Sequence, residues 1–440
     1  MGWNMSALGV TQIRGRESSG GKLDLRSSLI QCGLRRHLRS DLRLAGGLLS
    51  AVLFSISASP ARAQALDLLP QGLNLGSFRL FPTVPVKVTY DSNIRLLNTP
   101  VNDIIASVQP SVALRSSWSS HQLELLASSN LRRYKDNKDQ NSNEWQLSGD
   151  GRVDVDSSFT ISPSLTYARK VEVRGTPGDD ARLVGQTRYK QLDGAAAVSK
   201  RFNRLSVSGQ IGLSKLRYDD ILIGGVLTDL SFRNFTQTNG SLRLDYLISD
   251  LTNVFVTASA NRSDYVANPF GLNRDGKGYT ILGGLKLQPT SIISGEVSIG
   301  YLAQTFKDPS FKNFKGLNYN INISWKPTAL TTVQLGGGRS IVNSALVGVP
   351  GILRSNVRLS VTHELLRDLI LSPRLEREHE VYRGINRSQN RTSAGISARR
   401  IINRALSAVI GYDYQQLDVS GVTNAGYKGS RVTLSIIVAK

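Results

Sequence analysis

Apolar and polar residues alternate one by one along most of this sequence, and no other feature limits the possible folds as strongly. In residues 144–155, Trp145 and Leu147 fall on one face, whereas Glu144 and Gln146 fall on the other. A period of two places successive side chains on opposite faces of a β-strand, while an amphipathic helix needs apolar residues three and four apart. The pattern continues from Val84 to the C-terminus, so the sequence predicts an all-β protein.

Eighteen segments show this alternation, and the connections between them are short and long in turn. The short turns lie near Ser120, Asp156, Asn203, Asp250, Thr290, Thr328, Arg367 and Asn403. Longer connections such as 174–186, 219–233 and 266–276 are rich in Gly, Asp, Asn and Pro, which are residues typical of loops. The segments span approximately residues 84–90, 104–117, 121–134, 142–155, 158–171, 187–201, 204–218, 234–249, 252–265, 277–288, 291–306, 316–326, 330–343, 352–364, 368–382, 388–401, 404–417 and 427–437.

Short turns at one end and long loops at the other are typical of a transmembrane β-barrel of the outer-membrane type. In lipid, an open sheet edge would leave backbone N–H and C=O groups unpaired, at several kcal/mol each, so the sheet has to close. We therefore predict an antiparallel up-and-down barrel of about 18 strands (16–18), with short periplasmic turns and long extracellular loops. A soluble β-sandwich or propeller is the alternative, but it would show fully apolar inner strands.

Aromatic residues gather at the long-loop ends of the predicted strands. Such clustering indicates an aromatic girdle at one membrane interface, although Tyr is also common in strands generally. The residues concerned are Tyr90, Tyr134, Tyr218, Tyr265, Phe306, Tyr382 and Tyr414 on the rising strands, and Trp145, Tyr189, Phe235, Tyr279, Tyr319 and Tyr427 on the descending ones.

The N-terminal 63 residues have the order of a secretory signal peptide. Four arginines between positions 35 and 43 precede an apolar run over 44–56, and the small residues Ala61 and Ala63 form an A-x-A site. A membrane anchor helix is the alternative, but the apolar run is short for one. We expect cleavage after Ala63 and export by the general secretory route of a Gram-negative bacterium.

The remaining chain then divides into a periplasmic N-terminal segment, 64–82, and an outer-membrane barrel, 83–440. The single cysteine, Cys32, lies within residues 1–63, so the exported part has no thiol. A chain without thiols suits an oxidising compartment, because wrong disulfides cannot form in it.

The chain is strongly basic, with a net charge of +21, which indicates anionic partners. On the polar faces of the predicted strands, arginines would line the lumen and contact sugar acids or phosphates bidentately. Alternatively, these arginines and the carboxylates beside them only form cross-strand pairs within the wall. The predicted lumen-lining charges are Arg152, Arg243, Arg358, Arg374, Arg399, Arg431, Glu144, Glu364 and Glu376.

A second set of basic residues is expected in the outer loops, where it would bind lipopolysaccharide. It comprises Arg132, Arg133, Lys135, Lys138, Lys307, Lys312 and Lys315. Nucleic acid is a poor fit, because the charge is spread over the whole ladder of strands and the protein is exported.

Catalytic chemistry has little support in the sequence, and we expect no enzyme activity, no catalytic residues, no cofactor and no metal. The histidines after the leader are His121, in a predicted short turn, His363, on an apolar face, and His379. These histidines lack the spacing of a zinc site. Glu376, Glu378, His379 and Glu380 could bind a cation, but a solvated polar face is the better explanation for them. The Gly336–Gly338 run lies within a strand pattern and lacks the residues of a phosphate loop.

The stretch from Val86 to Ile94 resembles the first strand and the Tyr-Asp-x-Asn corner of the Putative beta-barrel porin 2 family of outer-membrane proteins. The matching corner residues are Tyr90, Asp91 and Asn93, and the resemblance covers about Phe81 to the C-terminus. Members are often associated with exopolysaccharide secretion. The resemblance therefore implies a porin-like conduit for surface polysaccharide.

Two other functions stay open: an anion-leaning diffusion porin for small solutes, and a closed barrel that anchors polymer or partner proteins. The partners expected for the barrel are outer-membrane lipid and lipopolysaccharide, an anionic polysaccharide, a periplasmic polysaccharide-export protein and the barrel-assembly machinery.

Overall fold

A computed structural model describes residues 70–175, 186–223, 226–268, 271–287, 292–344, 346, 348–422 and 425–440. All of these residues belong to one compact unit, Arg62–Lys440. The predicted signal peptide, with its cleavage site at Ala61 and Ala63, lies outside the described residues.

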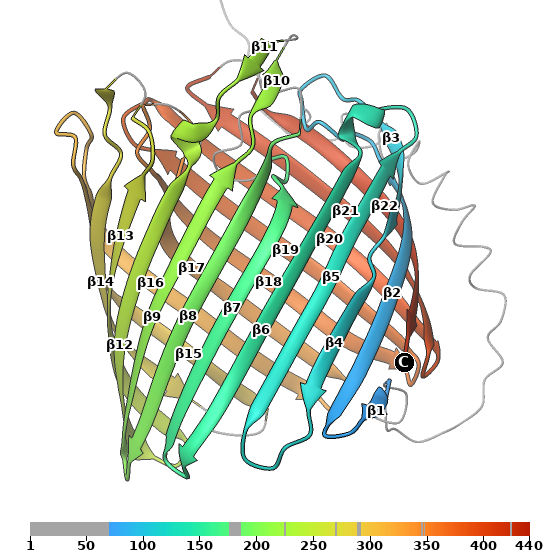
Figure 1. Ribbon diagram of the computed structural model, residues 1–440, viewed down its shortest axis with the longest axis vertical. Helices are drawn as coiled ribbons and strands as arrows, with labels where there is room; N and C mark the ends of the chain where they lie inside the picture. The colour runs from blue at the N-terminus through green and yellow to red at the C-terminus, as the bar shows by residue number, and fades with distance from the viewer. Residues whose placement is uncertain are drawn as a thin grey trace, which may run out of the picture. The chain divides into compact units, whose positions relative to one another are not determined.

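Antiparallel strands make up nearly all of the described chain (Figure 1). Their bounds are β1 Leu73–Leu75, β2 Phe78–Asp91, β3 Asp103–Val108, β4 Ser111–Ser116, β5 Gln122–Tyr134, β6 Ser142–Asp156, β7 Phe159–Val171, β8 Arg188–Phe202, β9 Leu205–Tyr218, β10 Ile221–Ile223, β11 Val226–Thr228, β12 Phe235–Ser249, β13 Thr252–Tyr265, β14 Gly276–Leu287, β15 Ile293–Phe306, β16 Phe314–Thr328, β17 Thr331–Val342, β18 Ile352–Leu366, β19 Leu369–Tyr382, β20 Arg387–Asn403, β21 Leu406–Ser420 and β22 Tyr427–Ala439.

Pairing of the first long strand with the last one closes the sheet into a barrel. β2 pairs with β22 over nine residues, from Thr83 opposite Ala439 to Asp91 opposite Arg431. On its other side, β2 pairs with β3 and β4, which are two halves of one strand interrupted at Pro110. Counted in this way, eighteen antiparallel strands form the wall, as the sequence predicts.

Short turns lie at one rim of the barrel and long loops at the other, as Figure 1 shows with the short turns at the bottom. Six of the short turns hold two residues each, at 157–158, 203–204, 250–251, 329–330, 367–368 and 404–405. The long connections include 92–102, 219–234 and 343–351. Thr83 and Ala439, which form one end of the β2–β22 pair, lie at the short-turn rim.

The two faces of the wall differ in character. Large apolar side chains at every second position are exposed on the outer face, such as Leu165 (57%), Ile211 (68%) and Ile299 (60%). The residues between them, which are mostly polar, face inward. A barrel in lipid needs this arrangement, because its outer surface meets hydrocarbon and its interior does not.

The strand boundaries agree closely with those predicted, with one difference at the N-terminal end. Residues 78–82, expected in a periplasmic segment, lie in β2, where Phe78–Thr83 pair with β4. The alternation in the sequence placed the start of this strand at Val84. A proline is tolerated in a strand where its missing N–H is not needed for the ladder, so the strand begins earlier.

Helical structure is a minor part of the described chain. Two 3₁₀ turns occur in the long loops, Lys138–Gln140 and Ser231–Arg233. Among the residues that the structure describes, no helix has the length and apolar character needed to cross a membrane.

The expected aromatic girdle is only partly present. Alternation along the strands places Tyr90, Trp145, Tyr279, Tyr319 and Tyr414 on the outer face. The other eight face inward, and Phe235, Tyr382 and Tyr427 among them are buried. Their clustering shows that they lie at one level of the barrel, but it does not show which face of the wall each ring is on. The inward rings form a packing surface for the long loops instead of an interface with lipid.

Replacing Asn93 with alanine tests how the first long loop holds the closing strands together. The buried Asn93 side chain donates to the carbonyls of Leu97 and Lys428, at 2.7 and 2.9 Å, and accepts from the Leu97 N–H. Loss of these bonds in a buried site should lower the free energy of unfolding by about 3 kcal/mol. Urea titration of the purified protein in detergent, followed by tryptophan fluorescence, measures the change.

The matched control is Asn102→Ala, in the same loop. Its exposed side chain makes one long contact with the hydroxyl of Tyr90, at 3.4 Å. An equal loss of stability in the two variants would contradict the role given to Asn93.

Candidate functional site: the inner face of the barrel

Most of the predicted lumen charges face inward, and most of them are paired. Arg358 Nη2 lies 2.7 Å from Glu376 Oε1, and Arg152 Nη2 lies 3.1 Å from Asp154 Oδ2. Arg243 contacts both Asp245 and Glu296, at 2.8 and 2.9 Å. The further pairs are Arg374 with Asp413, Arg431 with Asp91, and Glu144 with Arg132.

Arg399 and Glu364 differ from the other predicted charges. Within the ranges that the structure describes, neither takes part in an ion pair. Glu364 of β18 and Arg399 of β20 lie opposite Ile370 of β19, on its two sides. The charges on the inner wall therefore form mainly compensated pairs, as the second of the two sequence interpretations predicts.

Some of these pairs reach across intervening strands, and the curvature of the concave side brings such side chains closer together. Arg243 of β12 bonds Glu296 of β15 over the ring of Phe255, 3.8 Å from the guanidinium carbon. Gly284 lies beneath that ring, and a Cβ there would collide with it. Gly395 leaves space in the same way, so that Arg374 of β19 reaches Asp413 of β21.

The Tyr-Asp-x-Asn corner stabilises the closure of the barrel. Asp91 Oδ2 lies 2.6 Å from Arg431 Nε across the β2–β22 pair, and Asp91 Oδ1 accepts from the N–H of Asn93 at 2.9 Å. Asp91 and Asn93 are buried, whereas Tyr90 is 43% exposed on the outer face. These contacts give the motif a structural role within the fold.

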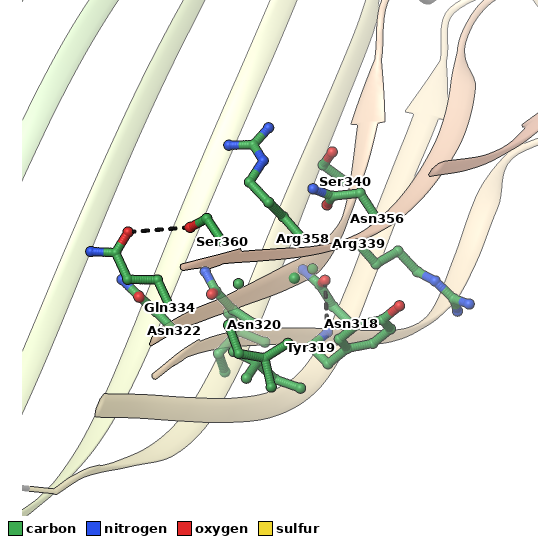
Figure 2. A pocket seen from close by; sticks show the side chains of 16 residues that line it. Asn318, Tyr319, Asn320, Asn322, Gln334, Arg339, Ser340, Asn356, Arg358 and Ser360 are labelled. Atoms are coloured by element: carbon green, nitrogen blue, oxygen red, sulfur yellow. Dashed lines mark hydrogen bonds between the residues drawn. The ribbon is translucent and has the colours of Figure 1, made fainter. Parts of the chain in front are cut away.

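A polar hollow of about 590 Å³ lies on the inner face of strands β16–β18. Asn318, Asn320 and Asn322 occupy successive inward positions of β16. Gln334 of β17 and Asn356, Arg358 and Ser360 of β18 complete this amide groove (Figure 2). Gly336 and Gly338 of β17 face inward between β16 and β18 and leave the space that side chains would otherwise fill.

The amide groove presents both hydrogen-bond donors and acceptors, because each amide side chain carries two donors and an acceptor oxygen. Gln334 and Ser360 are 3.5 Å apart, at the limit of a hydrogen bond. Arg339 lies on the outer face, where it stacks on Tyr319, and in Figure 2 its side chain points away from the hollow. Arg358 is thus the cation whose side chain lies in the groove.

Long loops lean over the mouth of the barrel. Arg274, between β13 and β14, donates to the carbonyl of Ser344, between β17 and β18, at 3.2 Å. Along the wall these two loops are four strand spacings apart, or about 19 Å, so they must bend inward to meet. Arg274 also donates to the carbonyl of Phe232 in a third loop.

The surroundings of Arg274 explain how it holds these loops. Its side chain is 1% exposed and stacks on the inward-facing Tyr265, 4.2 Å from the ring centroid. Burial lowers the pKa of its guanidinium, but arginine stays charged in proteins. A smaller hollow of about 200 Å³ lies beneath it, lined by polar residues that include Gln237, Asn261 and Gln304.

The histidines and the glutamate cluster do not converge on one site. His379 points outward and contacts Asn390 at 2.9 Å, while Glu376, Glu378 and Glu380 point inward. Glu378 and Glu380 pair with Arg391. His121 accepts a bond from the Asp154 N–H near a short turn, and His363 contacts Thr331 on the outer face. No group of metal-ligating side chains is found among the described residues.

Apart from Arg358, the residues of the amide groove were not among the predicted site residues, and neither was Arg274 in the loops. The alternation of Asn318, Asn320 and Asn322 with apolar residues is visible in the sequence. Only the strand register, however, brings Gln334, Asn356 and Ser360 beside them. Arg274 lies in a loop, for which the sequence gives no partner.

A closed antiparallel barrel with an apolar outside and a polar inside defines a porin-like protein of the outer membrane. The chain belongs to the family described as Putative beta-barrel porin 2, whose model matches residues 68–440. The search of curated proteins gives no match.

Among solved structures, the barrel is similar to the siderophore receptor PirA from Pseudomonas aeruginosa, with 9% identity, a TM-score of 0.45, and coverage of 84% of this chain and 81% of that one. It is also similar to OccK2 (OpdF) from the same organism, with 11% identity, a TM-score of 0.45, and coverage of 84% and 99%. OpdL of that organism matches at 12% identity and a TM-score of 0.43, covering 83% and 99%.

Neutralising one partner of the Arg358–Glu376 pair should change the ion selectivity of the barrel. Glu376→Gln leaves the charge of Arg358 uncompensated in the amide groove, so the permeability ratio of anions to cations should rise. Stability should change by less than about 1 kcal/mol, because Arg358 is mostly exposed. Reversal potentials in a salt gradient across a planar bilayer measure the ratio.

Asp264→Asn is the matched control, because it removes a carboxylate paired with Arg262 on the outer face. An equal shift in that variant, or no shift in Glu376→Gln, would contradict the placement of the pair along the path of ions.

Proposed function

We propose that this protein is a passive, non-enzymatic conduit that carries a surface or extracellular polysaccharide through the outer membrane. The amide groove on β16–β18 is the observation that supports this proposal most strongly. Its three asparagines lie at every second residue along β16, and so about 6.6 Å apart. A row of amides at regular spacing suits a ligand that repeats hydroxyl groups along its length, as a polysaccharide does.

Charge in the groove favours an acidic polymer. Arg358 pairs with Glu376 but is 59% exposed, so its guanidinium is accessible from the interior. Arg399 adds a second inward cation. Guanidinium groups bind carboxylates bidentately, which suits the acidic sugars of a charged polymer. Weak, repeated contacts of this kind would let the chain slide through without being held tightly.

Other proteins would supply the direction and the driving force. The short-turn rim and the segment before β2 would meet a periplasmic export protein. A signal peptide ending at Ala63 would direct the chain to the general secretory route, and the barrel-assembly machinery would insert it. These partners belong to the proposal and follow from the orientation of an outer-membrane barrel.

A small-solute porin is the second candidate function, and the loops at the mouth favour it. Val349, in the loop over 343–351, is 1% exposed and packs against the inward-facing Tyr382. Arg274 ties the same loop to two others. A mouth narrowed by packed loops passes small anions more readily than a polymer, unless the loops move during export.

Replacing two groove amides with leucine tests the polysaccharide proposal. Asn320→Leu/Asn322→Leu removes hydrogen-bonding groups without changing the charge. If each contributes one bond of about 1 kcal/mol, the half-saturating concentration of an acidic oligosaccharide should rise roughly 30-fold. Binding to the detergent-solubilised protein is measured by calorimetry, and release of the labelled oligosaccharide from proteoliposomes should slow in parallel.

The matched control is Gln146→Leu/Ser148→Leu, two inward positions of β6, on a different part of the wall. This variant should bind and release the oligosaccharide as the unmodified protein does. If both double variants weaken binding equally, or neither does, the amide groove is not the binding surface. Normal release of small anions with no oligosaccharide binding would support the small-solute porin.

A further inference from the structure

Basic side chains gather on the outer face of strands β7–β9, at their long-loop ends. We call Arg169, Arg188, Lys190, Lys215 and Arg217 the outer basic cluster. Alternation places them on the same face as the exposed apolar residues lower on these strands, including Leu165 and Ile211. A conduit through the interior makes no use of charge in this position.

The strand register places three of these charges in one row. Arg169 is directly opposite Lys190, and Lys190 is directly opposite Arg217. Directly opposed residues have Cβ atoms about 5 Å apart, and like charges at that distance destabilise the sheet. Among the residues that the structure describes, one carboxylate lies close by, since Asp219 contacts Arg169 at 2.8 Å. The five basic residues therefore keep a positive excess that calls for an anion.

Aromatic residues show the depth of this cluster in the membrane. Trp145 is directly opposite Arg169, and its ring packs edge-on against that of Tyr167, with centroids 5.3 Å apart. Outward Trp and Tyr residues mark the level of the lipid headgroups. The long-loop end of such a barrel faces the cell exterior, so the cluster lies at the headgroups of the outer leaflet.

We propose that the outer basic cluster is a binding site for the phosphate groups of lipopolysaccharide. Arg169 and Arg217 would contact phosphate oxygens in their fork geometry, and the lysines would act as mobile point charges. Arg217 is held in place on the wall, because its Nη1 donates to the carbonyls of Leu216 and Phe235 at 2.8 and 3.1 Å.

Two of the loop basic residues that were expected to bind lipopolysaccharide, Arg132 and Arg133, already have partners within the protein. Arg132 faces inward, where Glu144 neutralises it. Arg133, also in β5, uses Nη1 to contact the carbonyl of Ser142 and the side chain of Asn143. The site on β7–β9 is therefore distinct from that set, and it does not depend on what passes through the interior.

Removing two lysines of the cluster tests this site. Lys190 and Lys215 are both exposed, so Lys190→Gln/Lys215→Gln should leave the barrel folded. The probe is bisphosphorylated lipid A in phosphatidylcholine vesicles, and binding of the full-length purified protein is followed by flotation. Each basic residue at an anionic surface contributes about five-fold in affinity, so the double variant should bind about 25-fold more weakly.

Arg262→Gln is the matched control for loss of outer-face charge at a similar height. Arg262 is 70% exposed, but Asp264 already neutralises it at 2.9 Å, so its loss should leave lipid A binding unchanged. Lys190→Arg/Lys215→Arg should retain binding and show that charge, not fold, is responsible. Dephosphorylated lipid A should bind the unmodified protein about as weakly as bisphosphorylated lipid A binds the double glutamine variant.

Three results would overturn the proposal. The first is equal binding of phosphorylated and dephosphorylated lipid A. The second is an equal loss in Arg262→Gln, which would mean that general surface charge decides binding. The third is displacement of lipid A by inorganic phosphate at matched concentration, which would indicate a site for free phosphate instead of a lipid headgroup.

Discussion

Backbone hydrogen bonding in a medium without water is the constraint on which this structure depends. Hydrocarbon offers no partner to an N–H or C=O group, so a sheet in the membrane must pair its first strand with its last. Here β2 meets β22, and the Asp91–Arg431 pair with the buried Asn93 stabilises the long-loop end of that closure. The all-β architecture, the even number of wall strands and the position of the first and last strand ends at the short-turn rim follow from this closure.

Closure also creates a concave inner face, and the chemistry of the protein is found there. Glycines such as Gly284 and Gly395 let ion pairs span intervening strands, while Gly336 and Gly338 leave the amide groove open. Because most inward arginines have carboxylate partners, the basic excess of the chain does not make the interior strongly positive. Hydrogen-bonding side chains, more than net charge, characterise the inner face of β16–β18.

The sequence could predict the wall well, because alternation and turn residues are local properties. It placed the eighteen strands to within a few residues, except for the start of β2, and assigned Arg358 and Glu376 to one face. It could not show that Arg358 pairs with Glu376, since pairing depends on register between strands. The inward aromatic residues Tyr189 and Tyr218 were assigned to a girdle by their level alone, although Tyr189 lies on the opposite phase of its strand from the apolar residues Leu192 and Val198. Loop contacts such as those of Arg274 have no periodic signal at all.

Single-channel conductance of the purified protein in a planar bilayer, with and without an acidic polysaccharide, tests the central claim most directly. A polar inner face that conducts an acidic polymer predicts a steady current that the polymer reduces from the short-turn side. The Asn320→Leu/Asn322→Leu variant should then need much more polymer for the same reduction. Verified insertion without current, or a current unaffected by the polymer, would contradict the account.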